Sequence, residues 1–383
     1  MELDFDRDQD ALRESVRSFL TSECPIARVR AIVDARFVGR PVDTEPLHQQ
    51  MVALGWAALT VPEDADGLGL GPVELALVVE ELGRALVPGP LFATLTQFTP
   101  MVIELGSPDQ RRALLRSIAD GSAAGTVAIA EATGATDPAA TTTVAIPTAT
   151  GFTLHGSKHL VFEPTAGGHV VVVARIPESH GDAGVGAFVV PTDDVRLARI
   201  DATDPSRELA TVTFDGVAVH SDAALGTPGP VVAAGVRRAL QTATVGLALD
   251  AVGAAQQLFD VTLEYAKQRE QFGVPIGSFQ AIKHKFADML ILLERARALG
   301  YFAALTIAED DGRRALATAM AKAAAGDAVA KIAKEAIQVH GGIGYTWESD
   351  VHLYVRRLES DALLFGTAVQ HRHTVAELIG VGR

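Results

Sequence analysis

The segment 265–289 constrains the fold of this chain more than any other part of its sequence. A helical run ends around Arg269 and Phe272, Gly273 interrupts it, and a second helical run begins near Ser278. Apolar residues then recur at the spacing of one helix face, namely Ile282, Phe286, Met289, Leu290 and Leu293. The turn therefore projects a cation, an aromatic ring and an amide from between two long helices, which suits a large anionic, planar ligand.

The composition is that of a soluble globular protein with a large core. The 383 residues are 48% hydrophobic and 21% charged, and a chain of this length is expected to hold two or three domains. The net charge of −14 argues against nucleic acid or an anionic membrane as the main partner, because both would repel the chain. Cys24 is the only cysteine, which excludes an intramolecular disulfide and a cysteine-rich zinc site.

The sequence also argues against export and membrane insertion. The segment Met1–Asp6 is acidic where a secretory signal needs basic residues and then an apolar run. No span of about 18 apolar residues without charge occurs. We therefore expect a cytoplasmic protein without a membrane helix.

Hydrophobic patterning divides the chain into three segments. Residues 1–122 are predicted to be mostly helical, with one apolar stripe in the first helix (Leu12, Val16, Phe19) and another in Val73–Leu86. Residues 123–228 are predicted to form a small antiparallel β-domain, with β-favouring runs at Thr141–Ile146, His169–Ile176 and Ala210–Val217. Residues 229–383 are predicted to form a bundle resembling four helices, with alanine-rich runs at Ala233–Lys267, Phe279–Glu309 and Arg313–Val339. The predicted fold class is α+β.

A glycine-rich stretch, Gly67–Gly71, could suggest a dinucleotide-binding turn. It follows Pro62–Asp66 rather than a strand, so the strand–turn–helix context of such a site is missing. We predict a plain loop between helices.

A second motif, Gln338–Tyr345, follows the end of a predicted helix. The pair Gly341 and Gly342 is typical of a helix cap, and glycine backbone amides can also approach a pyrophosphate closely. Glu348, Tyr354 and Arg356 follow it at short intervals.

Together these motifs resemble the Arg-x-x-Phe-Gly and Gln-x-x-Gly-Gly-x-Gly-Tyr segments of acyl-CoA dehydrogenases. The order of helices, β-domain and helices is also similar, so the resemblance covers essentially the whole chain. It implies an FAD-dependent oxidoreductase that acts on an acyl-CoA thioester and passes electrons to an electron-transferring flavoprotein.

The resemblance also implies which residues contact a flavin. In that family both segments face the flavin of a neighbouring subunit. Arg269 would then pair with the pyrophosphate, because a fixed cationic fork suits phosphate oxygens. Phe272 would pack on the adenosine half. The remaining contacts are assigned to Gln280, Gln338, Gly341, Gly342 and Thr367.

The parts that would hold the chain's own flavin depart from the family pattern. In the loop 130–137, Ala130 and Ala132 stand where the family has Thr and Pro, although Glu131 and Asp137 match. In Gly156–Phe162, Leu160 replaces a Trp, and Phe162 replaces the Thr that hydrogen-bonds the isoalloxazine edge. Phe has neither a donor nor an acceptor.

The catalytic base is also missing from its family positions. Removal of the α-proton of a thioester needs a carboxylate, while the β-hydride goes to the flavin. The usual Glu position, just before Gly366-Thr367, is Phe365. In the minority arrangement the base and its adjacent arginine correspond to Ala243 and Thr244. No catalytic residue is therefore assigned.

Three nearby acids are candidate substitutes for the base. Asp250 lies on the same helix face as Ala243, two turns or roughly 10 Å further along. Glu359 and Asp361 precede Phe365, in a segment where acids are usually solvated.

The sequence shows no site for two other functions, metal binding and hydrolysis. His371 and His373 are two residues apart, so on a helix their rings diverge by roughly 200° and cannot hold one metal ion. No Gly-x-Ser-x-Gly elbow occurs, so a hydrolase lacks a nucleophile.

The departures follow a pattern, because what this chain would lend to a neighbour's flavin is retained and what it would use itself is lost. The leading hypothesis is a subunit of a heterotetrameric acyl-CoA dehydrogenase of fatty acid or steroid degradation, beside a homologous chain that carries the base. One alternative is a self-sufficient homotetramer with an unrecognised base. Another is a catalytically silent scaffold that binds acyl-CoA or a partner.

Overall fold

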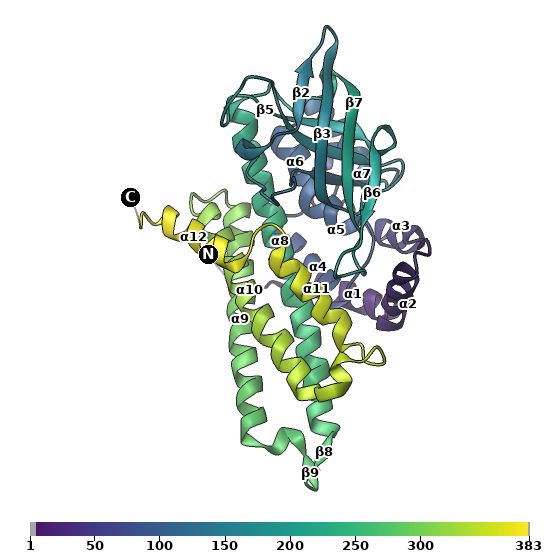
Figure 1. Ribbon diagram of the computed structural model, residues 1–383, viewed down its shortest axis with the longest axis vertical. Coiled ribbons are helices and arrows are strands. Elements are labelled where there is room, and N and C mark those ends of the chain that lie inside the picture. Colours follow the sequence, from purple (N-terminus) through teal and green to yellow (C-terminus); the bar gives the residue numbers. More distant parts are fainter. Residues whose placement is uncertain (1–4, 382–383) are drawn as a thin grey trace.

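The computed structural model describes residues 5–381, so Met1–Asp4 of the acidic amino-terminal segment lie outside the described part. A seven-stranded sheet stands at one end of the molecule, and long helices extend from it to the other end (Figure 1). The predicted α+β fold class, with helices before and after a β-domain, is confirmed. The proposed boundaries at residues 122 and 228 stay predictions.

The amino-terminal helices pack around α4. Their bounds are α1 Arg7–Glu23, α2 Ile26–Phe37, α3 Glu45–Ala53, α4 Pro72–Arg84, α5 Leu91–Ala93, α6 Thr99–Leu105 and α7 Pro108–Ala119. Asp6 caps α1, because its carboxylate accepts from the backbone amides of Asp8 and Gln9 at 2.9 and 2.8 Å. The Gly67–Gly71 stretch is a loop, as predicted: the Leu68 amide bonds back to Ala58 at 2.9 Å.

The β-domain is one mixed sheet. Its strands are β1 Gly125–Ala128, β2 Val144–Pro147, β3 Gly151–Phe162, β4 His169–Arg175, β5 Val185–Pro191, β6 Arg196–Ile200 and β7 Leu209–His220. The order is β1-β4-β2-β3-β7-β6, and β5 pairs with β4. Most pairs are antiparallel, as predicted, but β1 runs parallel to β4, and β2 meets β4 in parallel at one residue pair. One face of this sheet packs on α6, α7 and the start of α8.

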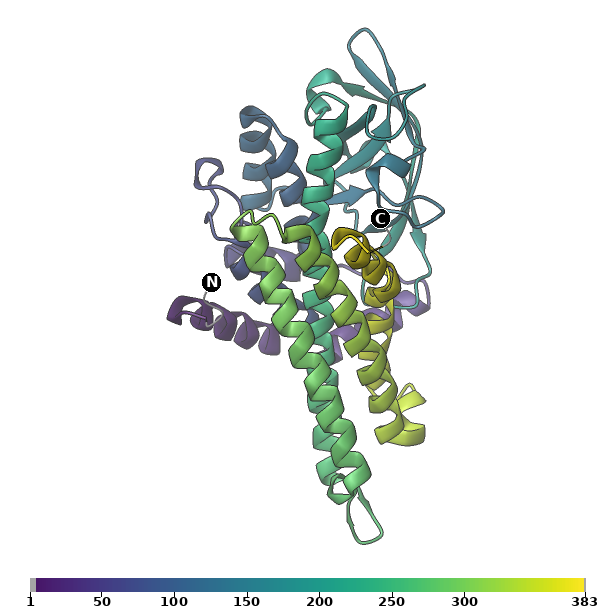
Figure 2. The ribbon, with the colours of Figure 1, turned by 90° about the vertical axis from the view of Figure 1, so that its left-hand side faces the viewer.

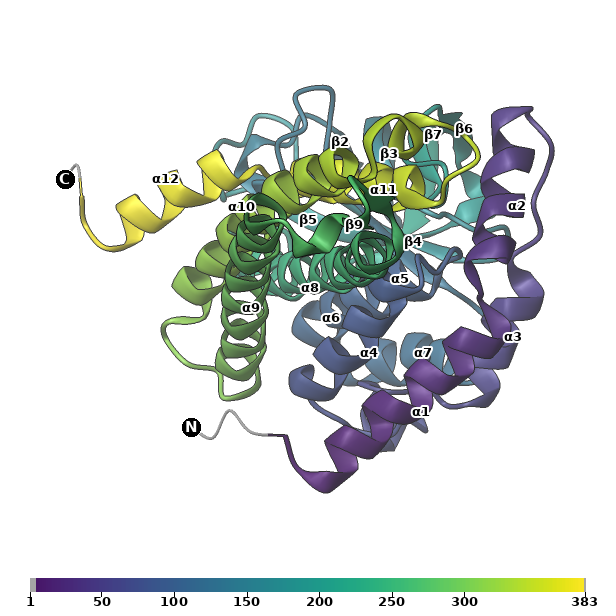
Figure 3. The same cartoon turned by 90° about the horizontal axis from the view of Figure 1, so that it is seen from below.

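The carboxyl-terminal segment contains three long helices and two shorter ones. Their bounds are α8 Pro230–Gln268, α9 Gln280–Ala308, α10 Arg314–His340, α11 Val351–Leu363 and α12 Ala368–Leu378. A short hairpin, β8 Glu270–Gln271 and β9 Val274–Pro275, joins α8 to α9 at the far end of the molecule. The long helices run side by side in Figure 2, and Figure 3 shows α8 in their middle, in contact with α4, α9, α10 and α11.

Glycines let the backbones of α4 and α8 touch. A Cβ atom on Gly83 of α4 would lie 2.0 Å from the carbonyl oxygen of Asp250, and one on Gly253 of α8 would lie 1.8 Å from that of Glu80. Only glycine fits at such a crossing. This contact places Asp250 deep between the amino-terminal helices and the bundle.

Candidate functional site

The predicted ligand-binding turn lies at the far tip of the bundle. Arg269 ends α8, Phe272 stands in the β8–β9 hairpin, and Gln280 begins α9. All three side chains are exposed, and Phe272 is 92% exposed with φ of 57°. The β-domain lies at the opposite end of the long axis (Figure 1), so these side chains cannot reach a ligand held there by the same chain.

The second motif lies beside this turn. Gln338 and Gly341–Gly342 end α10, and all are exposed. The ring of Tyr265, one turn before Arg269, stacks on that of His340 with centroids 4.4 Å apart. Open space surrounds the Cα atoms of both glycines, so a ligand could approach their backbone closely. The fold therefore brings together six of the seven predicted flavin contacts.

Thr367 is not part of this group. It lies beyond the other end of α11, a helix of 13 residues that spans roughly 20 Å. Its hydroxyl accepts from the Gln370 amide at 3.3 Å and thereby caps α12.

Three phenylalanine rings fill the position where the chain would hold its own flavin and base. Phe162 stacks on Phe365 with centroids 5.7 Å apart, and on Phe92 of α5 with centroids 5.9 Å apart. The cavity left between Phe162, Phe365, Leu160 and the 130–136 loop measures about 80 Å³. Ligand pockets typically measure about 300–1,000 Å³. The residues present here do not fit a flavin ring.

Local backbone geometry positions these rings. Leu160 and Phe365 have φ of 56° and 53°, and the pairing of β3 with β7 shifts between Lys158 and Val161. Lys322 of α10 holds the Phe365 loop, because its ammonium group donates to the carbonyl oxygens of Asp361 and Gly366 at 2.7 and 3.0 Å. Burial lowers the pKa of Lys322 to about 8.

Glu131, which matches the family pattern in the 130–137 loop, contacts the β-domain. Glu131 accepts from the Lys158 ammonium group at 2.7 Å and from the backbone amide of Thr143 at 2.8 Å. Burial by itself would raise the pKa of Glu131, but these hydrogen bonds outweigh burial and hold the pKa well below its usual range. Burial lowers the pKa of Lys158 to about 8. This pair ties the 130–137 loop to β3 without needing a ligand.

Beneath the rings lies a buried ion network that the sequence pattern did not predict. Arg357 is fully buried and donates to Asp204 at 2.7 Å and to Asp250 at 3.2 Å. Arg207 is also buried; it pairs with Asp361 at 2.6 Å and with Asp250 at 3.1 Å. The guanidinium carbon of Arg207 lies 4.5 Å from the Phe92 ring centroid and 5.4 Å from that of Phe162. The ion network and the three phenylalanine rings are therefore in contact, and together they are called the phenylalanine plug.

The plug contains Asp250 and Asp361, two of the acids that could have replaced the missing base. Asp250 is 1% exposed; burial disfavours its charge, but Arg207 and Arg357 outweigh burial and lower its pKa. Burial raises the pKa of Asp361 well above its ordinary value, and the adjacent Asp250 carboxylate adds to the shift. The expectation of a solvated Asp361 was wrong, whereas Glu359 is exposed. Neither buried acid can reach a substrate.

One sequence signal could have located part of this network. Arg357 and Asp361 are four residues apart, so they share a face of α11. The same face carries Tyr354 and Leu358, both buried. The partners Asp204, Arg207 and Asp250 come from distant segments, and no local pattern marks them.

Most of this chain matches known proteins of a single family. The model of the acyl-CoA dehydrogenase N-terminal domain matches residues 6–122, and that of the C-terminal domain matches residues 234–380. Acyl-CoA dehydrogenase IpdE2 of Mycobacterium tuberculosis is 31% identical over 365 residues, which cover 93% of this chain and 92% of that protein. The chain belongs to the acyl-CoA dehydrogenase family. Members of this family are oxidoreductases that generally bind FAD.

Solved structures of the family agree. Butyryl-CoA dehydrogenase of Megasphaera elsdenii is 25% identical with a TM-score of 0.89, over 99% of this chain and 100% of that one. A variant of the Tcur3481-Tcur3483 steroid ACAD is 30% identical with a TM-score of 0.84, over 98% of each chain. Over residues 5–381, no helix is long and apolar enough to cross a membrane. Within the same residues, no three His, Cys, Asp or Glu side chains are grouped to hold a metal ion.

Proposed function

We propose that this chain is the flavin-completing subunit of a heteromeric, FAD-dependent acyl-CoA dehydrogenase whose homologous partner chain carries the catalytic base. The observation that carries the proposal is the stack of Phe162 on Phe365. These rings stand where the family has a hydrogen-bonding Thr and the catalytic Glu, and they leave about 80 Å³. A chain built in this way needs its catalytic groups from another subunit.

Exposed groups at the tip of the bundle support a role in binding the flavin of another chain. Arg269, Gln338 and the Gly341–Gly342 backbone are exposed at the end of the bundle remote from the plug. A guanidinium is suited to the pyrophosphate of FAD, and the open space at the two glycines lets a phosphate approach the backbone closely. When bound, FAD accepts the β-hydride of the acyl-CoA thioester, and the residues at this tip orient it in the pocket of the neighbouring chain.

Apolar surface supports association with another chain. Large apolar side chains are exposed on the tip, on α9 and around α12, namely Phe272, Ile291, Ile343, Leu363 and Val369. In Figure 1, α12 projects sideways from the bundle. Exposed apolar surface that recurs over several elements is typical of protein interfaces.

The substrate class is proposed by analogy. The relative called the Tcur3481-Tcur3483 steroid ACAD bears the names of two different chains, which supports a heteromer here. We accordingly assign an acyl-CoA thioester whose acyl part comes from a fatty acid or a steroid side chain. An electron-transferring flavoprotein is the electron acceptor that the family implies.

Flavin stoichiometry tests the proposal. The chain is purified alone and after co-expression with candidate homologous partners, and flavin absorbance is divided by total protein. We expect little FAD in the chain alone and about one FAD for each pair of unlike chains in the complex. A crystal structure of the complex would locate that FAD against Arg269.

Two results would contradict the proposal in different ways. One FAD per chain, with acyl-CoA oxidation by the chain alone, would establish a self-sufficient homotetramer. Acyl-CoA binding without FAD or turnover in any combination would establish a scaffold.

A further inference from the structure

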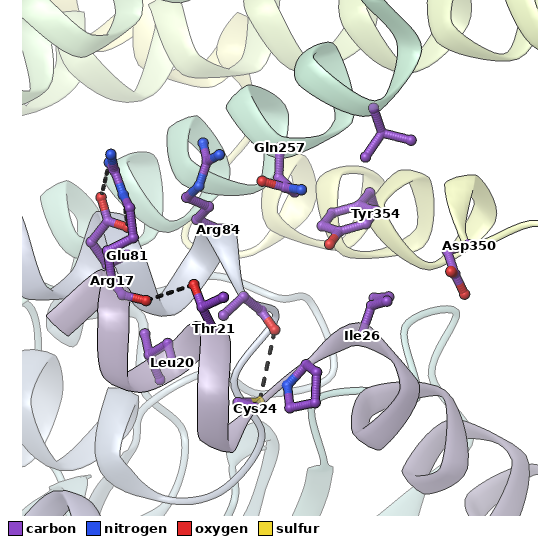
Figure 4. A pocket seen from close by; sticks show the side chains of 13 residues that line it. Arg17, Leu20, Thr21, Cys24, Ile26, Glu81, Arg84, Gln257, Asp350 and Tyr354 are labelled. Atoms are coloured by element: carbon purple, nitrogen blue, oxygen red, sulfur yellow. Dashed lines mark hydrogen bonds and ion pairs between the residues drawn. The ribbon is translucent and has the colours of Figure 1, made fainter. Parts of the chain in front are cut away.

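A second cavity is lined by none of the residues of the phenylalanine plug. It measures about 310 Å³ and opens between α1, α2, α4, α8 and α11 (Figure 4). Its apolar lining consists of Leu20, Pro25, Ile26, Ala85 and Val261. The neutral polar side chains of Gln257 and Tyr354 also line it. The proposed role in flavin binding does not use this space.

Every charged group that lines this cavity already has a partner. Arg17 of α1 forms two bonds to Glu81, at 2.9 and 2.5 Å. Arg84 bonds to Asp260 at 2.9 Å. Asp350 accepts from Arg30 at 2.8 Å. The cavity therefore offers no spare charge to an ionic ligand, and burying an unpaired ion there would be costly.

The polar groups that remain without a partner are neutral. Tyr354 is 5% exposed, yet no hydrogen bond to its hydroxyl forms anywhere in residues 5–381. The Gln257 amide has no hydrogen-bond partner within that part of the chain either. Figure 4 shows both side chains beside the cavity, Gln257 on α8 and Tyr354 on α11. Both groups line the cavity without a protein partner, so they are available to hydrogen-bond a molecule bound there.

The hydroxyl of Tyr354 is suited to act as a permanent donor. Burial raises its pKa, and the carboxylate of Asp350 adds to this shift. The phenol therefore stays protonated over the whole physiological range. An oxygen acceptor on the ligand would satisfy the phenol, and the Gln257 amide can donate a second bond to it.

We propose that this cavity is a binding site for a small, neutral, mostly apolar molecule with a hydrogen-bond-accepting oxygen, such as an alicyclic ketone. The oxygen accepts from Tyr354 and Gln257, and the hydrocarbon body lies on Leu20, Ile26 and Val261. A volume of about 310 Å³ is at the lower end of the range for ligand pockets and limits the ligand to one or two small rings.

Two probes of nearly the same shape test the class of ligand. Cyclohexyl methyl ketone is neutral, and cyclohexanecarboxylate carries a negative charge. Both are titrated against the full chain by saturation-transfer NMR. We expect the ketone to bind and the carboxylate to bind at least about tenfold more weakly, because the charges in the wall are already paired.

Three variants test the position. Tyr354→Phe removes a hydroxyl that bonds to no protein group, so the fold should be unaffected, and ketone affinity should fall about two- to tenfold. Tyr345→Phe removes a hydroxyl from a side chain that is 78% exposed outside the cavity, and it should leave ketone affinity unchanged. Ala85→Leu narrows the cavity and should abolish binding of the ketone.

The proposal is overturned if neither probe binds, if the carboxylate binds as well as the ketone, or if Tyr354→Phe and Tyr345→Phe behave alike. Persistence of ketone binding in Ala85→Leu would place the site elsewhere. None of these outcomes depends on flavin or on a partner chain, so they are independent of the test of the proposed function.

Discussion

At the scale of single residues, the buried arginines of the plug are expected to contribute more to the free energy of unfolding than arginines on the surface. Replacing Arg357 by Leu would leave the buried carboxylate of Asp204 without a cationic partner and that of Asp250 with Arg207 alone. We expect a loss of about 3–5 kcal/mol in the free energy of unfolding, measured by urea titration. Arg112→Leu is the control: that side chain is half-exposed and pairs with Asp109 at 3.3 Å, so its loss should cost less than about 1 kcal/mol. Equal losses would show that the network does not stabilise the fold.

Lys322 is expected to make stability depend on pH. Its folded pKa of about 8 lies below the ordinary value of 10.5. Between these values the unfolded chain binds more protons than the folded chain, so the contribution of Lys322 to stability rises with pH across this window. In Lys322→Met, the rise between pH 8 and 10.5 should be smaller than in the wild type by a quantity on the order of 3 kcal/mol.

Urea titrations at several pH values measure that difference. Lys331→Met is a suitable control, because Lys331 is a partly exposed lysine on the same helix. Parallel pH profiles of the wild type and Lys322→Met would contradict the expectation.

At the scale of elements, the hairpin between α8 and α9 is predicted to act on a neighbouring chain. Arg269→Ala should weaken retention of FAD in the assembled complex roughly 10- to 150-fold, because a charge-assisted contact to phosphate contributes about 1.5–3 kcal/mol. Flavin occupancy after dilution and gel filtration measures the loss. Lys267→Ala removes a cation two residues away that pairs with Glu264, and it should retain flavin normally. Full occupancy in Arg269→Ala would make that residue purely structural.

The helices themselves followed from periodicity, with one informative error. The predicted run Phe279–Glu309 corresponds to α9, Gln280–Ala308. Phe286, Met289 and Leu293 are buried as expected, but Leu290 is 43% exposed. At 100° per residue, Leu290 stands a full step away from Met289 and faces outward. Its exposure fits a surface that another chain could cover.

At the scale of the whole molecule, one substitution should not restore catalysis. Phe365→Glu places a carboxylate at the family position of the base, but Phe162 and Phe92 still fill the flavin position next to it. We expect no acyl-CoA-dependent reduction of an artificial electron acceptor by this variant expressed alone. Phe365→Leu serves as the comparison without a carboxylate. Substantial activity of Phe365→Glu would show that the plug is not what prevents catalysis.

The whole molecule also separates two sites that the chain cannot combine. The tip residues lie at one end of the long axis, and the plug lies next to the β-domain. Because α8 and α10 are continuous helices of 39 and 27 residues, no local movement joins these ends. If the tip completes a flavin pocket, as we propose, that pocket belongs to another chain.

The sequence by itself determined the elements, the family and the missing chemical groups. Helix and strand patterns arise from local spacing of apolar residues, so α8, α9, α10 and three of the strands could be located. The absence of a carboxylate at Phe365 and of a hydroxyl at Phe162 is likewise a matter of residue identity.

Only the tertiary structure decided what replaced those groups. The stack of Phe92, Phe162 and Phe365 joins α5, β3 and the loop after α11, and Arg207 reaches Asp250 and Asp361 across similar separations in the chain. The burial of Asp250 and the shift of its pKa depend on these distant partners. The same holds for Tyr354, because five helices from distant parts of the chain line the cavity that its hydroxyl faces. Contacts between remote segments leave no periodic trace in a single sequence, and for that reason they could not be predicted from it.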